Sequence, residues 1–248
     1  MKKPKKEEIM QRWYKRRFIL PNAVTVGNMF CGFLTIVYAT SGRFDKACIA
    51  IALGILLDGF DGKVARKLNA TSKFGMEFDS LSDVITFGVA PAVLMYNWCF
   101  KTSADEFGVL VNFIYLICTA SRLARFNVTE PDLKRFCGLP SPAAAAGVAS
   151  FVFLDPISRD SIWLTGIGAV VMLSLAYLMV CRIPYISIKV FQMKSMPLRG
   201  RLAIGLVIAL VWWKPQWSLF LLSAGYALSG PVALFLSSKR KMGISPQE

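Results

Sequence analysis

Hydrophobic residues along this chain fall into eight runs separated by short polar or proline-containing segments. A window of about 19 residues, suited to finding membrane-spanning helices, gives the following pattern. The runs lie near 22–42, 45–65, 78–100, 107–124, 141–155, 161–181, 201–213 and 216–237. A helix needs about 20 apolar residues to cross a bilayer, so the runs near 141–155 and 201–213 are short. The pattern predicts an all-α, polytopic membrane helix bundle with about eight transmembrane helices, and six or seven spans are the alternatives.

A single membrane domain is expected to occupy the whole of residues 1–248. Its basic N-terminal segment, 1–20, interleaves apolar and aromatic residues with Lys and Arg, which is typical of an amphipathic helix lying in the membrane interface. A disordered tail is the alternative for this segment. The transmembrane bundle is expected over 21–238, followed by a cytosolic tail over 239–248.

Composition and charge agree with a membrane protein. Hydrophobic residues make up 55% of the chain and charged residues 18%. With eight spans, Lys and Arg collect on one side of the membrane, at both ends of the chain and in segments 63–77, 125–140 and 182–201. This positive-inside pattern predicts an integral protein of the cytoplasmic membrane with both termini cytosolic. The net charge of +14 is therefore attributed to topology and to anionic lipid, and nucleic-acid binding is not expected because no recognition motif accompanies it.

The chain contains no histidine and six cysteines. The cysteines lie mainly in the apolar runs without a Cys-x-x-Cys pair, so they are interpreted as small buried hydrophobes. Without imidazole, proton abstraction must fall to a carboxylate, Lys, Tyr, Cys or metal-bound solvent.

Four aspartates lie in or beside the second and third apolar runs. Asp58 and Asp61 are three residues apart, and Asp79 and Asp83 are four apart, so each pair shares one helix face. Ionised groups inside a membrane are costly and indicate function. Two such pairs on neighbouring helices can form an oxygen-rich box, the ligand set preferred by Mg²⁺ or Mn²⁺.

Small and basic residues follow the first acidic pair. Gly62 and Ala65 lie on roughly the same face as Asp58, where their small size lets a phosphate approach the backbone. Arg66 adds a planar, permanently charged fork for phosphate oxygens. The alternatives are a turn at Asp61-Gly62 and a cation path in a transporter. Transporters usually carry repeated halves, and no second copy of the acidic pattern occurs.

The complete run Asp58-x-x-Asp61-Gly62-x-x-Ala65-Arg66, eight residues, Gly75-x-x-x-Asp79-x-x-x-Asp83 resembles the motif of the CDP-alcohol phosphatidyltransferases. That resemblance implies transfer of a phosphoalcohol group from a CDP-linked donor to an alcohol, with release of CMP. It also implies two divalent cations, Mg²⁺ or Mn²⁺, held by Asp58, Asp61, Asp79 and Asp83, with Asp83 as the candidate general base. The residues it assigns to the CDP donor are Asn22, Thr25, Asp58, Gly62, Ala65, Arg66 and Gly75.

A second element, Pro21-Asn22-Ala23-Val24-Thr25, resembles the segment with which this family contacts the CDP group. Asn22 and Thr25 are also expected to cap the start of the first transmembrane helix, whose free amide groups can bind an anion. Capping alone is the alternative interpretation.

Two later segments, 121–128 and 136–146, resemble the branch of the family that uses serine as acceptor, the membrane-embedded phosphatidylserine synthases. The implied substrates are CDP-diacylglycerol and L-serine, and the family resemblance also suggests a homodimer. The candidate acceptor residues are Arg122, Arg125, Asn127 and Ser141. Interface snorkelling is the alternative for the arginines, and glycerol 3-phosphate, inositol phosphate or another alcohol is the alternative acceptor.

Overall fold

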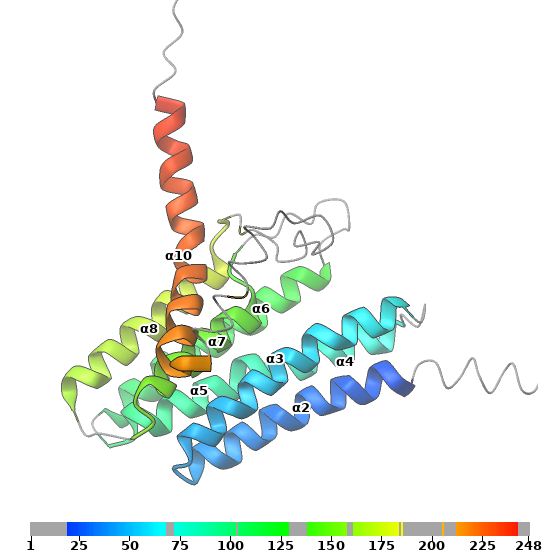
Figure 1. Cartoon of the computed structure of the whole chain (residues 1–248), viewed down its shortest axis with the longest axis horizontal. Helices are drawn as coiled ribbons and strands as arrows, with labels where there is room; N and C mark the ends of the chain where they lie inside the picture. Colours follow the sequence, from blue (N-terminus) through cyan, green and yellow to red (C-terminus); the bar gives the residue numbers. More distant parts are fainter. Residues whose placement is uncertain are drawn as a thin grey trace, which may run out of the picture.

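The computed structural model describes residues 19–67, 72–102, 104–128, 138–157, 161–183, 185, 205 and 212–242. Within these ranges, the side chains of 19–20, 64–67 and 235–242 are outside the description. Helices account for all the regular structure in the described part of the chain (Figure 1). In chain order they are α2 Ile19–Thr40, α3 Phe44–Lys67, α4 Lys73–Asp83, η1 Val84–Val89, α5 Ala90–Met95, η2 Tyr96–Phe100, α6 Asp105–Val128, α7 Ser141–Leu154, α8 Ile162–Val180 and α10 Pro215–Met242.

Five helical stretches in the described ranges are long and apolar enough to cross a membrane. They are Pro21–Thr40, Lys73–Phe100, Asp105–Val128, Ile162–Val180 and Pro215–Leu234. Helix α3 is also long, at 24 residues, but it carries the first acidic pair, and α7 has only 14 residues, about 21 Å of helix. The prediction of an all-α membrane bundle is thus confirmed in its coarse form. The number eight stays a prediction, because the run near 201–213 and the expected N-terminal amphipathic helix lie almost entirely outside the described residues.

The third expected span is one continuous helical rod of 28 residues, Lys73–Phe100, interrupted by the π-helical turns η1 and η2. Pro91 lies at the start of α5 and cannot donate a hydrogen bond to the carbonyl of Phe87 four residues earlier. The buried Tyr115 hydroxyl of α6 donates to this Phe87 oxygen instead, at 3.0 Å. The Phe87 carbonyl, which Pro91 cannot reach with an amide hydrogen, is therefore hydrogen-bonded by a neighbouring helix, as polar backbone groups in a membrane require.

Small residues allow the helices that carry the acidic pairs to approach closely. Helix α2 packs along α3, and both contact the rod beginning at α4 (Figure 1). A Cβ added at Gly32 would lie 2.9 Å from the Cα of Thr86, and one added at Gly54 would lie 2.7 Å from its Cγ2. Glycine at these two positions leaves room for Thr86 of η1, so that α2, α3 and η1 can pack closely around it.

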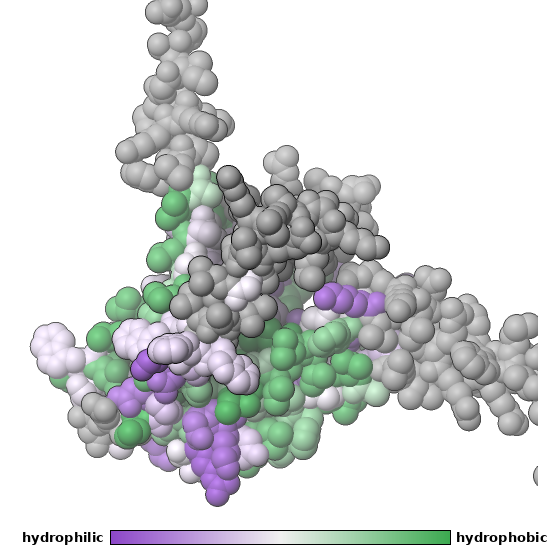
Figure 2. All heavy atoms as spheres, viewed as in Figure 1, coloured by the Kyte–Doolittle hydropathy of each residue, from purple (hydrophilic) through white to green (hydrophobic). Residues whose placement is uncertain are grey.

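Helix α7 lies inside the bundle and contacts α3, α8 and α10. Ala144, Ala145 and Val148 are fully buried, so the alanine run serves as a packing face. Large apolar side chains on α2, α3, α6, α8 and α10 are exposed, and Figure 2 shows hydrophobic surface over much of the described part of one face. Such a surface is stable only against lipid or another apolar partner.

A positive backbone angle at Gly138 fixes the approach to α7. Gly138 has φ +88°, and a Cβ there would lie 2.3 Å from the carbonyl oxygen of Met179. The amide of Gly138 donates to Ile183 O at 2.9 Å, and that of Leu139 donates to Leu178 O at 2.8 Å. These bonds hold the segment preceding Ser141 against the end of α8.

Candidate metal and substrate site

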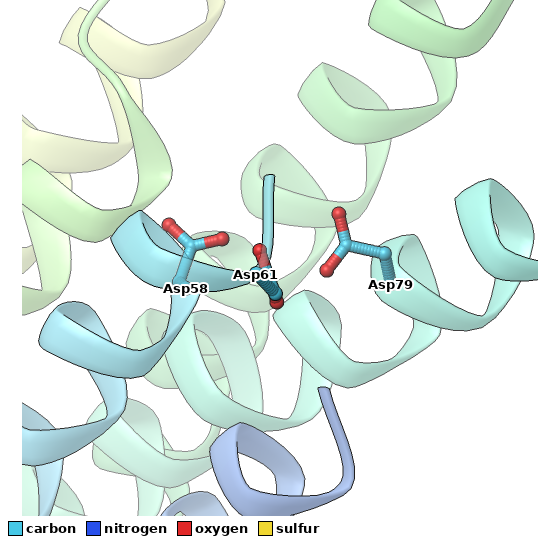
Figure 3. Close-up of side chains that lie close together, drawn as sticks. All are labelled: Asp58, Asp61 and Asp79. Carbon is cyan, nitrogen blue, oxygen red and sulfur yellow. The ribbon is translucent and has the colours of Figure 1, made fainter. Parts of the chain in front are cut away.

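Three of the four predicted aspartates, two on α3 and one on α4, bring their carboxylates together. One carboxylate oxygen from each of Asp58, Asp61 and Asp79 can be chosen so that all three lie within 4.8 Å of one another. Figure 3 shows Asp58 and Asp61 on consecutive turns of α3, with the Asp79 carboxylate pointing toward them from α4. The predicted convergence of the two acidic pairs therefore occurs for these three residues.

The environment of these carboxylates fits a divalent cation. Asp61 is only 5% exposed, and the buried Oδ1 of Asp79 lacks a hydrogen-bond partner. Three carboxylates this close repel one another unless a cation or protons compensate them. Carboxylate oxygens are the ligands that Mg²⁺ and Mn²⁺ prefer, so Asp58, Asp61 and Asp79 suit a metal site.

Asp83 lies one helical turn beyond Asp79 and is not part of this three-residue group. It is buried, with 9% of its surface exposed, and its Oδ1 accepts a hydrogen bond from Asn28 Nδ2 at 3.2 Å. The expected box of four aspartates is thus three grouped carboxylates with a fourth held separately by α2.

The N-terminal part of α2 reaches the acidic group through Thr25. Its Oγ1 lies 3.4 Å from Asp61 Oδ2 and 3.2 Å from the carbonyl oxygen of Pro21. The expectation that Asn22 and Thr25 cap the start of this helix is wrong, because α2 already includes Ile19. Proline is tolerated in the first turn of a helix, so the chain does not need to begin its helix after Pro21.

A cap does occur at α4, at a residue that the sequence analysis did not single out. Ser72 is the N-cap, and its Oγ accepts a hydrogen bond from the amide of Gly75 at 3.0 Å. The sequence signal for this cap was a serine directly before the helix, because Ser is a preferred N-cap residue and bonds the amide three residues later. A Cβ at Gly75 would lie 3.4 Å from Asn22 Oδ1. The two predicted donor residues Asn22 and Gly75 are therefore neighbours in the structure.

The remaining predicted donor residues lie on the last two turns of α3. Gly62 is half-buried directly after Asp61. Ala65 and Arg66 belong to the helix, but their side chains lie outside the described residues.

The four acceptor candidates make contacts in three places. Arg122 of α6 and Ser141 of α7 meet, with Arg122 Nη1 donating to Ser141 Oγ at 3.2 Å, while the buried Nε of Arg122 has no partner. Arg125 Nη1 instead donates to the carbonyl oxygen of Val180 at 3.2 Å. Asn127 Nδ2 donates to Ser80 Oγ at 2.9 Å, which places Asn127 beside the residue that follows Asp79.

Comparison with known proteins identifies the class to which this fold and site belong. The profile of the CDP-alcohol phosphatidyltransferase family matches residues 18–181, which include every aspartate and arginine discussed above. The chain belongs to this family.

Individual relatives narrow the comparison to a branch of the family. The chain is 44% identical over 140 residues to a CDP-diacylglycerol–serine O-phosphatidyltransferase of Helicobacter pylori, a match covering 56% of this chain and 59% of that protein. It is 39% identical over 168 residues to the enzyme of the same name from Bacillus subtilis, covering 67% of this chain and 89% of the relative. It is also 38% identical over 171 residues to the archaetidylserine synthase of Methanothermobacter thermautotrophicus, covering 67% and 69% respectively.

Proposed function

We propose that this protein is a divalent-metal-dependent phosphatidyltransferase that moves the phosphatidyl group of CDP-diacylglycerol to the hydroxyl of L-serine and releases CMP. The observation that carries this proposal is the convergence of Asp58, Asp61 and Asp79 from the complete family motif. The similarity to serine phosphatidyltransferases supports serine as acceptor.

The donor is assigned to the site built by α2, α3 and the start of α4. Asp58, Asp61 and Asp79 hold two divalent cations, Mg²⁺ or Mn²⁺, with Asp83 as a further ligand candidate. When bound, these cations supply charge neutralisation at the pyrophosphate of the donor. The residues proposed to contact the CDP group are Asn22, Thr25, Asp58, Gly62, Ala65, Arg66 and Gly75.

The proposed reaction is a single displacement at the phosphorus atom that carries the diacylglycerol. The serine oxygen forms a new bond to that phosphorus, the bond from phosphorus to the CMP oxygen breaks, and CMP leaves with the electron pair. Asp83 accepts the proton of the serine hydroxyl. An ordinary carboxylate has a pKa near 4 and is a weak base for an alcohol, so positioning of the two reactants must contribute much of the rate.

The acceptor is assigned to the surface between α6 and α7. Arg122 offers two donors to an acceptor molecule: its unpartnered Nε, and Nη1, which contacts Ser141. A guanidinium with a free donor suits the serine carboxylate, since hydrogen bonds between charged groups are strong and directional. Arg125 and Asn127 remain further acceptor candidates, although their contacts in the structure are with Val180 and Ser80.

The membrane arrangement proposed for the whole chain follows the charge pattern. It comprises an interfacial segment over 1–20, a bundle of eight spans over 21–238 and a tail over 239–248, in one domain of the cytoplasmic membrane. Both termini and the site face the cytosol. The proposed partners are membrane lipid and a second copy of the chain in a homodimer, and nucleic acid is not one of them.

An acceptor panel with the purified full chain tests this function. CMP release from CDP-diacylglycerol is measured with Mn²⁺ or Mg²⁺ and with serine, ethanolamine, glycerol 3-phosphate or inositol phosphate. We expect serine to support release and ethanolamine, which lacks the carboxylate, to support much less. A preference for glycerol 3-phosphate or inositol phosphate would overturn serine as acceptor but leave the transferase class in place.

A further inference from the structure

A buried amide on α2 touches the residue assigned as general base. Asn28 is fully buried, and its Nδ2 donates to Asp83 Oδ1 at 3.2 Å. Its other side-chain atom, Oδ1, is buried without a hydrogen-bond partner. Buried polar atoms are nearly always paired, so an amide that leaves its oxygen unpaired while donating to a carboxylate calls for an explanation.

Three helices fix the position of this amide. The backbone oxygen of Asn28 accepts a hydrogen bond from Thr86 Oγ1 at 3.0 Å. This bond connects α2 to η1, the π-helical turn that begins immediately after Asp83. On the other side, a Cβ added at Gly54 of α3 would lie 3.2 Å from Asn28 Oδ1. Asn28 therefore has little freedom to move, because α2, α3 and η1 enclose it.

The orientation of the amide has a chemical consequence for Asp83. Rotation of the amide by half a turn would place Oδ1 against a carboxylate oxygen, and two acceptors repel each other. With Nδ2 facing Asp83, the amide occupies one carboxylate oxygen and restricts rotation of the group. The second oxygen is then held in a defined direction relative to Asp79, one turn earlier on the same helix.

From this geometry we infer that Asn28 is a positioning residue, which orients the Asp83 carboxylate for proton transfer from the acceptor hydroxyl. The inference rests on the proposed function, in which Asp83 is the base. Asn28 is assigned no contact with the donor or the acceptor. Its loss should consequently slow the reaction without weakening donor binding, which depends on other residues.

The test compares Asn28→Asp and Asn28→Ala with the native chain in detergent. Asn28→Asp keeps the shape but replaces the donating nitrogen by an oxygen that repels Asp83, and Asn28→Ala removes the contact. We expect kcat to fall about ten- to a hundredfold in both variants, the scale of one hydrogen bond to a charged group. The KM for CDP-diacylglycerol, and its binding in the presence of metal without acceptor, should stay within about twofold of the native values.

Thr35→Val provides the matched control. Thr35 is also a fully buried polar residue of α2, and its hydroxyl lies 2.9 Å from Cys31 O and 3.4 Å from Ala47 O of α3, away from the aspartates. This variant should keep the native kcat, whatever its effect on thermal stability. Equal losses of kcat in Thr35→Val and Asn28→Asp would show a general packing effect and overturn the inference.

The outcomes separate this inference from the proposed function. Native kcat in both Asn28 variants, or a loss of donor binding as large as the loss of kcat, would overturn the positioning role while the function stands. If serine supports no CMP release by the native chain, the proposed acceptor is wrong. The same kcat comparison is then made with the alcohol that the panel identifies, and it supports or overturns the role of Asn28 by the same criteria.

Discussion

Asp79 Oδ1 is buried without a hydrogen-bond partner, and two further carboxylates approach the Asp79 side chain closely. A buried acceptor of this kind costs about 1–3 kcal/mol, and more when it is charged. A bound cation removes both the repulsion and the unpaired acceptor. At the residue scale, this group is therefore where metal and activity should be most tightly linked.

Replacing Asp79 by Asn tests that link. Asn keeps the size of the side chain but removes its charge, so activity should fall by at least about a hundredfold, as expected of a metal ligand. Asp58→Asn and Asp61→Asn should behave alike. Metal-dependent CMP release and metal binding are measured together on each purified variant.

Glu77→Gln is the control, because Glu77 is an exposed acid on the same helix, two residues before Asp79. It should retain native activity. An Asp79→Asn enzyme that keeps more than about a tenth of native activity, a barrier change below about 1.4 kcal/mol, would contradict the metal-ligand role.

The two arginines of α6 make a second residue-scale prediction. If Arg122 holds the serine carboxylate, Arg122→Lys should raise the serine KM about tenfold or more, because Lys lacks the planar fork. Arg125→Lys should have a smaller effect, since Arg125 turns toward Val180. Steady-state kinetics with varied serine would show equal KM values for both variants if this assignment were wrong.

At the residue scale, the sequence predicts which carboxylates group together better than it predicts the residues that contact them. Asp58, Asp61 and Asp79 could be grouped because helical spacing fixes the face on which each carboxylate lies. Asn28 was missed although it is a polar residue within an apolar run, a signal of function in membranes. Its contact with Asp83 joins positions 55 residues apart, which no local spacing encodes.

At the scale of the elements, the residues that precede α7 combine a positive φ angle at Gly138 with close packing against the end of α8. Gly138 and Gly42 both have positive φ, but only the former faces another backbone, while a Cβ at Gly42 meets nothing within 4 Å. Gly138→Ala must therefore displace the end of α8 or the segment that leads to Ser141. Gly42→Ala carries only the cost of a left-handed conformation, about 1–2 kcal/mol.

We expect Gly138→Ala to lower the Tm of the detergent-solubilised protein clearly more than Gly42→Ala. It should also raise the serine KM, because Ser141 and its contact with Arg122 lie three residues beyond Gly138. Thermal unfolding and serine kinetics on the matched pair check both effects. Equal Tm values for the two variants would show that the contact with Met179 is not a tight one.

Element boundaries were predictable where apolar runs end in polar residues or turns, as at Ser41-Gly42. The π-helical turns of the Lys73–Phe100 rod were not, since they depend on how Pro91, Phe87 and Tyr115 of α6 meet. The start of α2 was placed too late because Asn22 and Thr25 were expected to cap it. The helix already includes Ile19, since the first turn of a helix accepts proline such as Pro21.

On the scale of the whole molecule, hydrophobicity determines the class of fold and charge determines its expected orientation. The sequence predicted a polytopic helical bundle, and the described residues contain five helical stretches that can span a membrane. Periodicity does not reveal how those helices pair. The structure supplies that pairing, which brings α2, α3 and α4 together at the acidic group and α6 against α8 and near α7 at Arg122.

The most direct test of the central claim follows phosphatidyl transfer itself. The purified full chain is incubated with CDP-diacylglycerol and isotope-labelled serine, with Mn²⁺ or Mg²⁺ and then with excess EDTA, and both CMP and labelled lipid are quantified. The proposed function predicts one labelled phosphatidylserine for each CMP, no product with EDTA, and recovery when metal is restored. CMP release that continues in EDTA, or that forms no labelled lipid, would contradict it.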